Sequence, residues 1–77
     1  MKVKVLDIQA GKLISILNEK DAKELGLLPL ERIRISKNNS AEIHTPVDIT
    51  ESFVREGEIG LVKDVAKYLK VTNRSIV

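Results

Sequence analysis

The sequence predicts a small, mainly β domain with two short helices, in which six strands close into a barrel built from two related halves. Two observations lead to this fold class. Short runs in which apolar and polar residues alternate, as they do in half-buried strands, recur along the chain. In addition, residues 57–71 resemble residues 14–27 without a gap: Leu61 falls on Leu17, an offset of 61 − 17 = 44 residues.

Three strands are expected in the first half, at residues 2–9, 12–17 and 32–36. Each is rich in Val, Ile or Leu, and the third, "RIRIS", alternates strictly. Residues 10–11 supply the turn between the first two strands, and residues 37–40 form a polar loop after the third.

The first helix is expected to begin at Asn18, whose side-chain oxygen can accept a hydrogen bond from the amide of Asp21 or its neighbour. Ala22 and Leu25 form the apolar side of this helix, and acidic residues in its first turn suit the helix dipole. Gly26 can end the helix, because glycine adopts a positive φ at little cost.

The second half repeats this order of elements. Strands are expected at residues 41–49, 57–61 and 75–77, and a helix at residues 62–69. Pro46 must lie at an edge, an end or a bulge of its strand, because it has no amide hydrogen. The apolar stripe of the helix, at i, i+3, i+4 and i+7, consists of Val62, Val65, Ala66 and Leu69.

Each half, about residues 1–38 and 39–77, therefore contains strand, strand, helix and strand in that order. Neither half could bury both faces of its strands alone. Two copies related by a pseudo-twofold axis could interlock into a closed six-stranded barrel, which removes free strand edges. Chance similarity between two amphipathic helices is the alternative, but the flanking strands repeat as well and favour the repeat.

The composition argues against several classes of function. The 77 residues suffice for one domain, and 13 basic and 11 acidic side chains are mixed along them, for a net charge of +2. Nucleic-acid binding is not expected, because a basic stripe and stacking aromatic residues are both lacking. The absence of cysteine excludes disulfides and thiolate metal sites. No apolar run approaches the roughly 20 residues of a membrane span, and no signal-peptide pattern is present, so a cytoplasmic location is expected.

Groups that could carry chemistry are few. His44 is the single histidine, and Asp48 would share its strand face two pleats away, but an exposed histidine is the simpler interpretation. Glu51, Glu56 and Glu58 lack the spacing of metal ligands, so a solvated acidic connection is expected. We therefore expect no catalytic and no metal-binding residue within the chain.

A phosphate-binding loop is a further candidate. Gly57 and Gly60 precede the second helix and Lys63 lies in its first turn, but the residue spacing of a phosphate-binding loop is missing. Close packing inside the barrel accounts for Gly60 equally well. No cofactor site is expected.

The densest basic patch of the sequence lies on and after the third strand. Arg32 and Arg34 alternate with isoleucines and so project together, and Lys37 follows just past the strand. These three residues could meet an anionic partner, although an ordinary solvated face is the interpretation that we favour.

The motifs "VLDI" with "AGK" close behind it, "LNEKDAKELG", and "GEIGL" before the second helix resemble the N-terminal domain of archaeal AMP phosphorylases, a branch of the thymidine phosphorylase family. The resemblance implies a double-psi β-barrel. It also implies a parent enzyme that cleaves AMP with inorganic phosphate to adenine and ribose 1,5-bisphosphate. The phosphate and nucleotide sites of that family lie in later domains, so these 77 residues are expected to be the non-catalytic N-terminal part of a longer enzyme.

Two turns depart from the Gly-Asp pattern of the family, since they contain Leu30-Glu31 and Arg74-Ser75 instead. A left-handed conformation is unfavourable for leucine and arginine. We therefore expect these turns to be shaped differently, with Asn73 taking the positive φ in the second half.

In that family the barrel is associated with building the multimer, so a homo-oligomer is expected, with nucleoside monophosphate and phosphate bound by domains outside this chain. Apolar residues in the connections, expected to be exposed, are candidate subunit contacts: Leu27, Leu28, Leu30, Phe53 and Val54. The alternative function is a freestanding double-psi or AbrB-like module that binds a protein partner or DNA through the basic patch.

Overall fold

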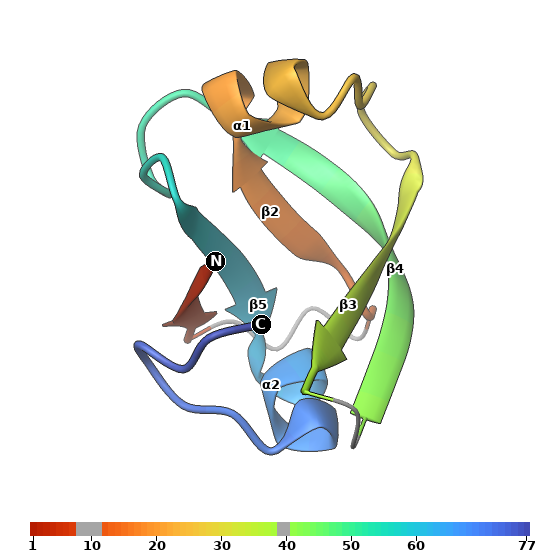
Figure 1. Cartoon of the computed structure of the whole chain (residues 1–77), viewed down its shortest axis with the longest axis vertical. Helices are drawn as coiled ribbons and strands as arrows, with labels where there is room; N and C mark the ends of the chain where they lie inside the picture. Colours follow the sequence, from red (N-terminus) through yellow and green to blue (C-terminus); the bar gives the residue numbers. More distant parts are fainter. Residues whose placement is uncertain (8–11, 39–40) are drawn as a thin grey trace.

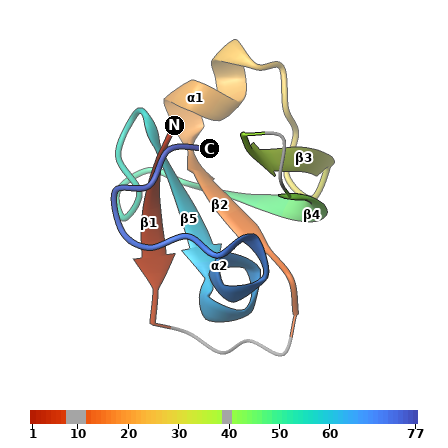
Figure 2. The same ribbon diagram turned by 60° about the horizontal axis from the view of Figure 1, so that its bottom comes forward.

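A computed structural model describes residues 1–7, 12–38 and 41–77, so the turn expected at residues 10–11 lies outside the described residues. Five strands and two helices form within these ranges, and Figures 1 and 2 show the strands curling round the core with the two helices at opposite ends. The strands are β1 (Lys2–Leu6), β2 (Ser15–Asn18), β3 (Arg32–Lys37), β4 (Ala41–Thr50) and β5 (Glu58–Val62). The helices are α1 (Glu19–Glu24) and α2 (Lys63–Leu69). The domain is therefore mainly β with two short helices, as predicted.

The strand order in the sheet is β1-β5-β2-β4-β3. Two pairs are parallel, β1 with β5 and β2 with β4, and each joins a strand from the first half of the chain to one from the second half. The pairs β2 with β5 and β3 with β4 are antiparallel. Because the strands of the two halves alternate across the sheet, neither half could form its own sheet.

Residues 75–77, where the sixth strand was expected, do not form a strand. The expected strand is replaced by a single antiparallel bridge between Lys2 and Ile76, which the amide of Val77 extends by donating to the carbonyl of Met1 at 3.0 Å. We refer to residues 75–77 as the C-terminal segment.

The expected start and end of the first helix are confirmed. The Asn18 side-chain oxygen accepts a hydrogen bond from the amide of Lys20 at 2.9 Å. Gly26 has a φ of +70° at the other end, and the amide of Leu27 donates to the carbonyl of Ala22 at 2.9 Å. A polar cap and a left-handed glycine thus define α1 through local interactions.

Hydrogen bonds recur at the offset of 44 residues that the sequence shows. The bond from Leu27 to Ala22 has its counterpart in a 3.0 Å bond from the amide of Val71 to the carbonyl of Ala66. Gly26 and its counterpart Lys70 both adopt the left-handed region, with φ of +70° and +56°. The two helices therefore end in the same way although only one has a glycine there.

The expectation about the turns was wrong, because Leu30 and Arg74 themselves adopt positive φ, of 69° and 71°. In each turn the left-handed residue donates its amide to the carbonyl of a neighbouring strand. These two equivalent bonds run from the amide of Leu30 to the carbonyl of Val47, at 2.7 Å, and from the amide of Arg74 to the carbonyl of Val3, at 2.8 Å. Asn73 does not take the positive φ; its side-chain oxygen accepts a hydrogen bond from the amide of Val5 at 2.7 Å. Pairing with the sheet therefore overrides the local preference of leucine and arginine.

The core is aliphatic and lies inside the curled sheet between the helices. Its fully buried side chains include Leu17, Val47, Leu61, Val65 and Leu69. In the part of the chain that the structure describes, no helix is long and apolar enough to cross a membrane.

Candidate functional site

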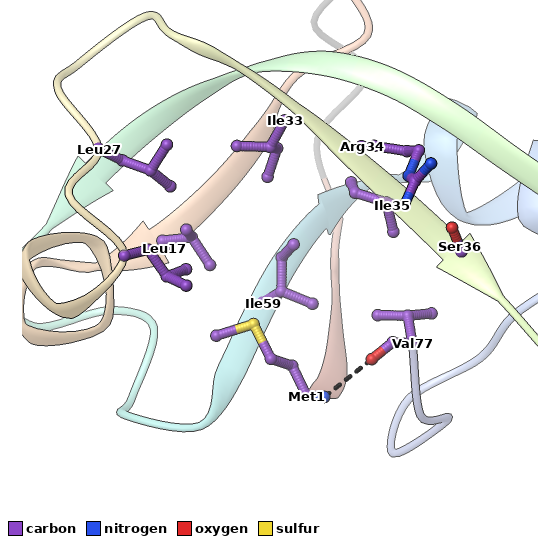
Figure 3. Close-up of a pocket in the computed structure, with 10 residues that line it drawn as sticks. Met1, Leu17, Leu27, Ile33, Arg34, Ile35, Ser36, Ile59 and Val77 are labelled. Atoms are coloured by element: carbon purple, nitrogen blue, oxygen red, sulfur yellow. Dashed lines mark hydrogen bonds between the residues drawn. The ribbon is translucent and has the colours of Figure 1, made fainter.

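An apolar groove opens between β3 and the C-terminal segment, with a volume of about 150 Å³. Figure 3 shows the side chains of both elements facing this space, with β5 at its floor. It is lined chiefly by Leu17, Leu27, Ile33, Ile35, Ile59 and Val77. We call this feature the β3 groove. Its largely aliphatic lining suits apolar contacts.

The alternation of β3 produces the groove, because Ile33 and Ile35 face inward while Arg32 and Arg34 face outward. The C-terminal segment forms the opposite wall. Its position is held by the N-terminal ammonium group, which donates to the carbonyl of Val77 at 2.9 Å, as the dashed line in Figure 3 marks.

The predicted basic patch does not form as a set of three residues. Lys37 belongs to β3 and has the same parity as Ile35, so it lies on the face opposite to Arg32 and Arg34. Its ammonium group donates to the carbonyl of Lys70, at the end of α2, at 3.0 Å. Helix C-termini attract cations in this way.

The two arginines do share an exposed face of β3. The Nε atom of Arg34 lies 3.8 Å from Oε2 of Glu42 on the neighbouring strand β4. This pair is largely solvated, so it contributes little to stability. Arg32 and Arg34 therefore remain as the basic part of this face, partly balanced by a carboxylate.

His44 is exposed on β4, opposite Arg34 of β3. Asp48 uses a side-chain oxygen to accept a hydrogen bond from the amide of Ile49 at 2.9 Å. His44 and Asp48 therefore both lie exposed on the surface of the sheet, as the sequence predicted for the histidine.

The two glycines of the candidate phosphate loop lie before and within β5 (Glu58–Val62), which runs directly into α2. Gly57 has a φ of +81° and donates its amide to the Asp21 carboxylate at 2.7 Å. Lys63, at the start of α2, pairs with Asp7, and its hydrogen bond and its charge both lower the pKa of that carboxyl. A Cβ atom on Gly60 would lie only 2.9 Å from Val54. Its role as a close-packing position is therefore confirmed.

The acidic connection before β5 makes structural contacts. Glu56 lies 3.3 Å from the Lys20 ammonium group in an exposed ion pair. Glu58 accepts a hydrogen bond from the amide of Arg55 at 3.0 Å and so closes the turn. Across residues 1–7, 12–38 and 41–77, no group of three His, Cys, Asp or Glu side chains could hold a metal ion.

The candidate subunit contacts divide into exposed and buried residues. Leu28 is 67% exposed, Leu30 is 70% exposed and Phe53 is 44% exposed. Val54 is fully buried, at 0%, because its side chain packs against Gly60 of β5, so its expected exposure was wrong. Leu27 is half-buried and packs against the core.

Leu25 was expected on the buried side of α1, but it is 62% exposed. The short α1 buries only Ala22. Leu25 lies instead at the rim of the β3 groove. The sequence pattern missed this position because a helix of one and a half turns presents too few residues to define its buried face.

A further hollow, of about 330 Å³, lies where the start of β4 meets the end of α2. Its lining consists of Lys37, Ala41, Tyr68, Leu69 and Lys70. The lining mixes apolar and cationic groups, and the Lys37 hydrogen bond to the end of α2 occupies one side of it.

Fold and surface together define a small, mainly β module whose notable surfaces are apolar. No family model matches the chain. It is, however, 41% identical over 69 residues to the AMP phosphorylase of Methanococcoides burtonii, a match that covers 90% of this chain and 13% of that protein. It is 33% identical over 76 residues to the AMP phosphorylase of Pyrococcus furiosus, which covers 99% of this chain and 15% of that protein.

AMP phosphorylase 2 of Archaeoglobus fulgidus is 28% identical over 76 residues, again covering 99% of this chain and 15% of the relative. The chain is therefore homologous to archaeal AMP phosphorylases, and the resemblance to their N-terminal domain is confirmed. It spans only about one seventh of the length of the curated relatives that it matches.

Proposed function

We propose that the chain is the N-terminal assembly domain of an AMP phosphorylase, a transferase of nucleotide metabolism that cleaves AMP with phosphate to adenine and ribose 1,5-bisphosphate. The observation that carries this proposal is the coverage of 90% or more of the chain by a 13–15% segment of such enzymes. Catalysis belongs to domains outside these residues, which bind the nucleotide and phosphate. The location is the cytoplasm, and no cofactor is required.

The fold that we propose is a double-psi β-barrel of six strands, made of pseudo-twofold-related halves at about residues 1–38 and 39–77. Supporting this proposal are the two parallel pairs, which each join the halves, and the turns that recur at the 44-residue offset. The bridge between Lys2 and Ile76 is the counterpart of the pair Pro46 and Arg32, because 2 + 44 = 46 and 32 + 44 = 76.

Assembly into a homo-oligomer is proposed to use the exposed apolar residues around α1. Leu28 and Leu30 follow this helix, while Phe53 lies in the connection that meets its N-terminal end. In Figure 1 both connections lie at the α1 end of the domain, away from α2. Exposed apolar residues gathered at one end of a small domain are typical of protein–protein contacts.

Two experiments test the proposed function. The first is the mass of the native polypeptide in its source cell, together with phosphate-dependent release of adenine from AMP by that polypeptide. A mass several times that of this chain and phosphate-dependent cleavage are expected. A native product that ends at Val77 would overturn the enzyme assignment.

The second experiment changes Leu28 and Phe53 to Ser in the native multimer. We expect dissociation, measured by sedimentation, with the strands of the domain still folded. Tyr68→Ser is the matched control, because Tyr68 is 60% exposed but lies on α2 at the other end. A multimer that survives the double change would refute these contacts.

A second candidate function rests on the shared exposed face of Arg32 and Arg34. A freestanding double-psi or AbrB-like module could bind an anionic protein partner or DNA there. Duplex binding at physiological salt that weakens on Arg34→Ala, together with a native product of 77 residues, would favour this function. Unchanged affinity in that variant would dismiss it.

A further inference from the structure

The connection between β4 and β5, residues 51–57, is fastened to the N-terminal end of α1, beside which it lies in Figure 1. The side-chain amide of Asn18 donates a hydrogen bond to the carbonyl of Val54 at 2.8 Å, and Asn18 is only 7% exposed. The amide of Gly57 donates to the Asp21 carboxylate at 2.7 Å. Residues at the start of α1 therefore hold the connection both at its middle and at its end.

Phe53 is the aromatic residue of this connection, and Lys4 of β1 holds it from a second side. The ammonium group of Lys4 donates to the carbonyl of Phe53 at 2.6 Å and lies 5.7 Å from the centroid of the Phe53 ring. A cation at this distance is attracted to the face of an aromatic ring. The next residue, Val54, is completely buried, whereas Phe53 is 44% exposed. Phe53 is thus partly open to solvent although its backbone and its ring are both held.

The second half of the chain lacks the residues that hold Phe53. At the offset of 44 residues, the counterpart of Asn18 is Val62, which makes no side-chain hydrogen bond at the start of α2. The counterpart of Lys4 is Asp48, whose side-chain oxygen accepts a hydrogen bond from the amide of Ile49 instead. The equivalent elements therefore form without these two interactions, which indicates a role that belongs to the α1 end alone.

We propose that Lys4 and Asn18 are positioning residues, which hold Phe53 in place before a second copy binds and so make it a preorganised anchor of the subunit contact. This inference rests on the proposed function, because it needs that contact. Aromatic residues are enriched at the centres of protein interfaces. A side chain that is already fixed in the free subunit loses less conformational entropy on binding. The clamp of Lys4 and Asn18 therefore acts on subunit affinity through Phe53.

The variant Lys4→Met in the native multimer tests the role of Lys4, because methionine keeps an unbranched apolar side chain but has no ammonium group. The subunit dissociation constant, measured by sedimentation, is expected to rise about tenfold. Lys2→Met is the matched control, since Lys2 lies on the same face of β1 and, within the described residues, its ammonium group takes part in no hydrogen bond or ion pair. The control should change the dissociation constant by less than about twofold.

A Lys4→Met variant that associates as tightly as the parent, while Phe53→Ser weakens association, would overturn the proposal and leave the subunit contact standing. If Phe53→Ser itself has no effect, the contact at Phe53 and the present inference both fail. The mass of the native polypeptide and its cleavage of AMP test the phosphorylase assignment independently of either result.

Combining Lys4→Met with Phe53→Ser separates positioning from a general structural role. If Lys4 acts through Phe53, adding Lys4→Met to Phe53→Ser should change the dissociation constant by less than about twofold. A general loosening of the barrel, or a direct contact of Lys4 with the second copy, would weaken association equally in both backgrounds. Such additive effects would overturn the proposal.

Asn18→Ser tests the other half of the clamp. Serine is as good a helix cap as asparagine, but it has no amide group to donate to the carbonyl of Val54. We expect a severalfold rise in the dissociation constant that is again absent when Phe53→Ser is present. Slow hydrogen exchange at the amide of Leu25, which donates to the carbonyl of Asp21 at 3.0 Å, reports that α1 is intact. Unchanged subunit affinity with α1 intact would overturn the positioning role of Asn18.

Discussion

The hydroxyl groups of Ser15 and Thr45 hydrogen-bond to each other at 2.7 Å, and both residues are completely buried. They lie on the neighbouring strands β2 and β4, which come from different halves of the chain. An unpaired hydroxyl in such a site retains the cost of its desolvation. The pair therefore links the two halves through a polar contact inside an aliphatic core.

Changing Thr45 to Val should lower the free energy of unfolding by about 1–3 kcal/mol, because the Ser15 hydroxyl loses its partner. The double variant Ser15→Ala with Thr45→Val should recover much of that loss, because neither residue then carries a buried hydroxyl. Urea unfolding monitored by circular dichroism measures both. A double variant that loses more free energy of unfolding than the two single variants lose together would contradict this account.

Lys70 adopts a φ of +56° at the end of α2, where a glycine would be unstrained. Lys70→Gly should raise the free energy of unfolding by about 0.5–1 kcal/mol, since the Lys37 hydrogen bond uses a backbone carbonyl that glycine retains. Thermal unfolding provides the measurement. The matched control is Gly26→Ala, at the equivalent position of α1, where no atom lies within 4 Å of an added Cβ. This control should be destabilising. A destabilising Lys70→Gly together with a stabilising Gly26→Ala would argue against backbone strain.

Gly60 packs closely against Val54. A Cβ atom added to Gly60 would lie 2.9 Å from Val54 Cγ2 and 3.1 Å from Leu6 Cδ1. Gly60→Ala should therefore destabilise the domain by about 1–3 kcal/mol through overpacking. Combining it with Val54→Ala should make the two changes less harmful together than their sum, which a double-mutant cycle in urea detects. Strict additivity would mean that the clash is relieved elsewhere.

The pKa of the Asp7 carboxyl is lowered from its ordinary value of 3.8, first by the hydrogen bond from Lys63 and then by the positive charge of that residue. A carboxyl whose folded pKa is depressed stabilises the fold above its unfolded pKa, and this stabilisation is lost as the pH falls through the folded value. Lys63→Met should raise the pKa of Asp7, as followed by NMR titration, and should make stability less dependent on pH below about 4. Because Asp7 is fully exposed, added salt should weaken the effect in the parent chain. An Asp7 pKa that does not respond to Lys63→Met would contradict the pairing.

Local elements of the fold were predictable because their signals lie within a few residues. The cap at Asn18 and the left-handed glycine at Gly26 are both recognisable from side-chain chemistry alone. Pro46 was placed at an edge, an end or a bulge, and it lies inside β4, one residue before that strand begins to pair with β2. The 44-residue offset predicted which elements would be equivalent, and the hydrogen bonds at the ends of both helices follow it.

The surface was less predictable, because exposure depends on which distant segments meet. Val54 and Phe53 are neighbours of similar character, yet Val54 is completely buried and Phe53 is 44% exposed. The difference arises because Gly60 leaves room for one side chain. Lys37 likewise does not lie in the predicted basic patch. Strand β3 extends one residue further than expected and directs Lys37 toward the end of α2.

The sequence by itself determined the order of strands and helices, the caps of the first helix and the internal repeat, because these depend on side-chain chemistry and periodicity over short spans. Only the tertiary structure decided the left-handed turns at Leu30 and Arg74 and the groove between β3 and Val77. Each of these features is made where segments from the two halves of the chain meet. Hydrogen bonds to a neighbouring strand then outweigh the local preference of the residue, and no pattern within one segment records that contact.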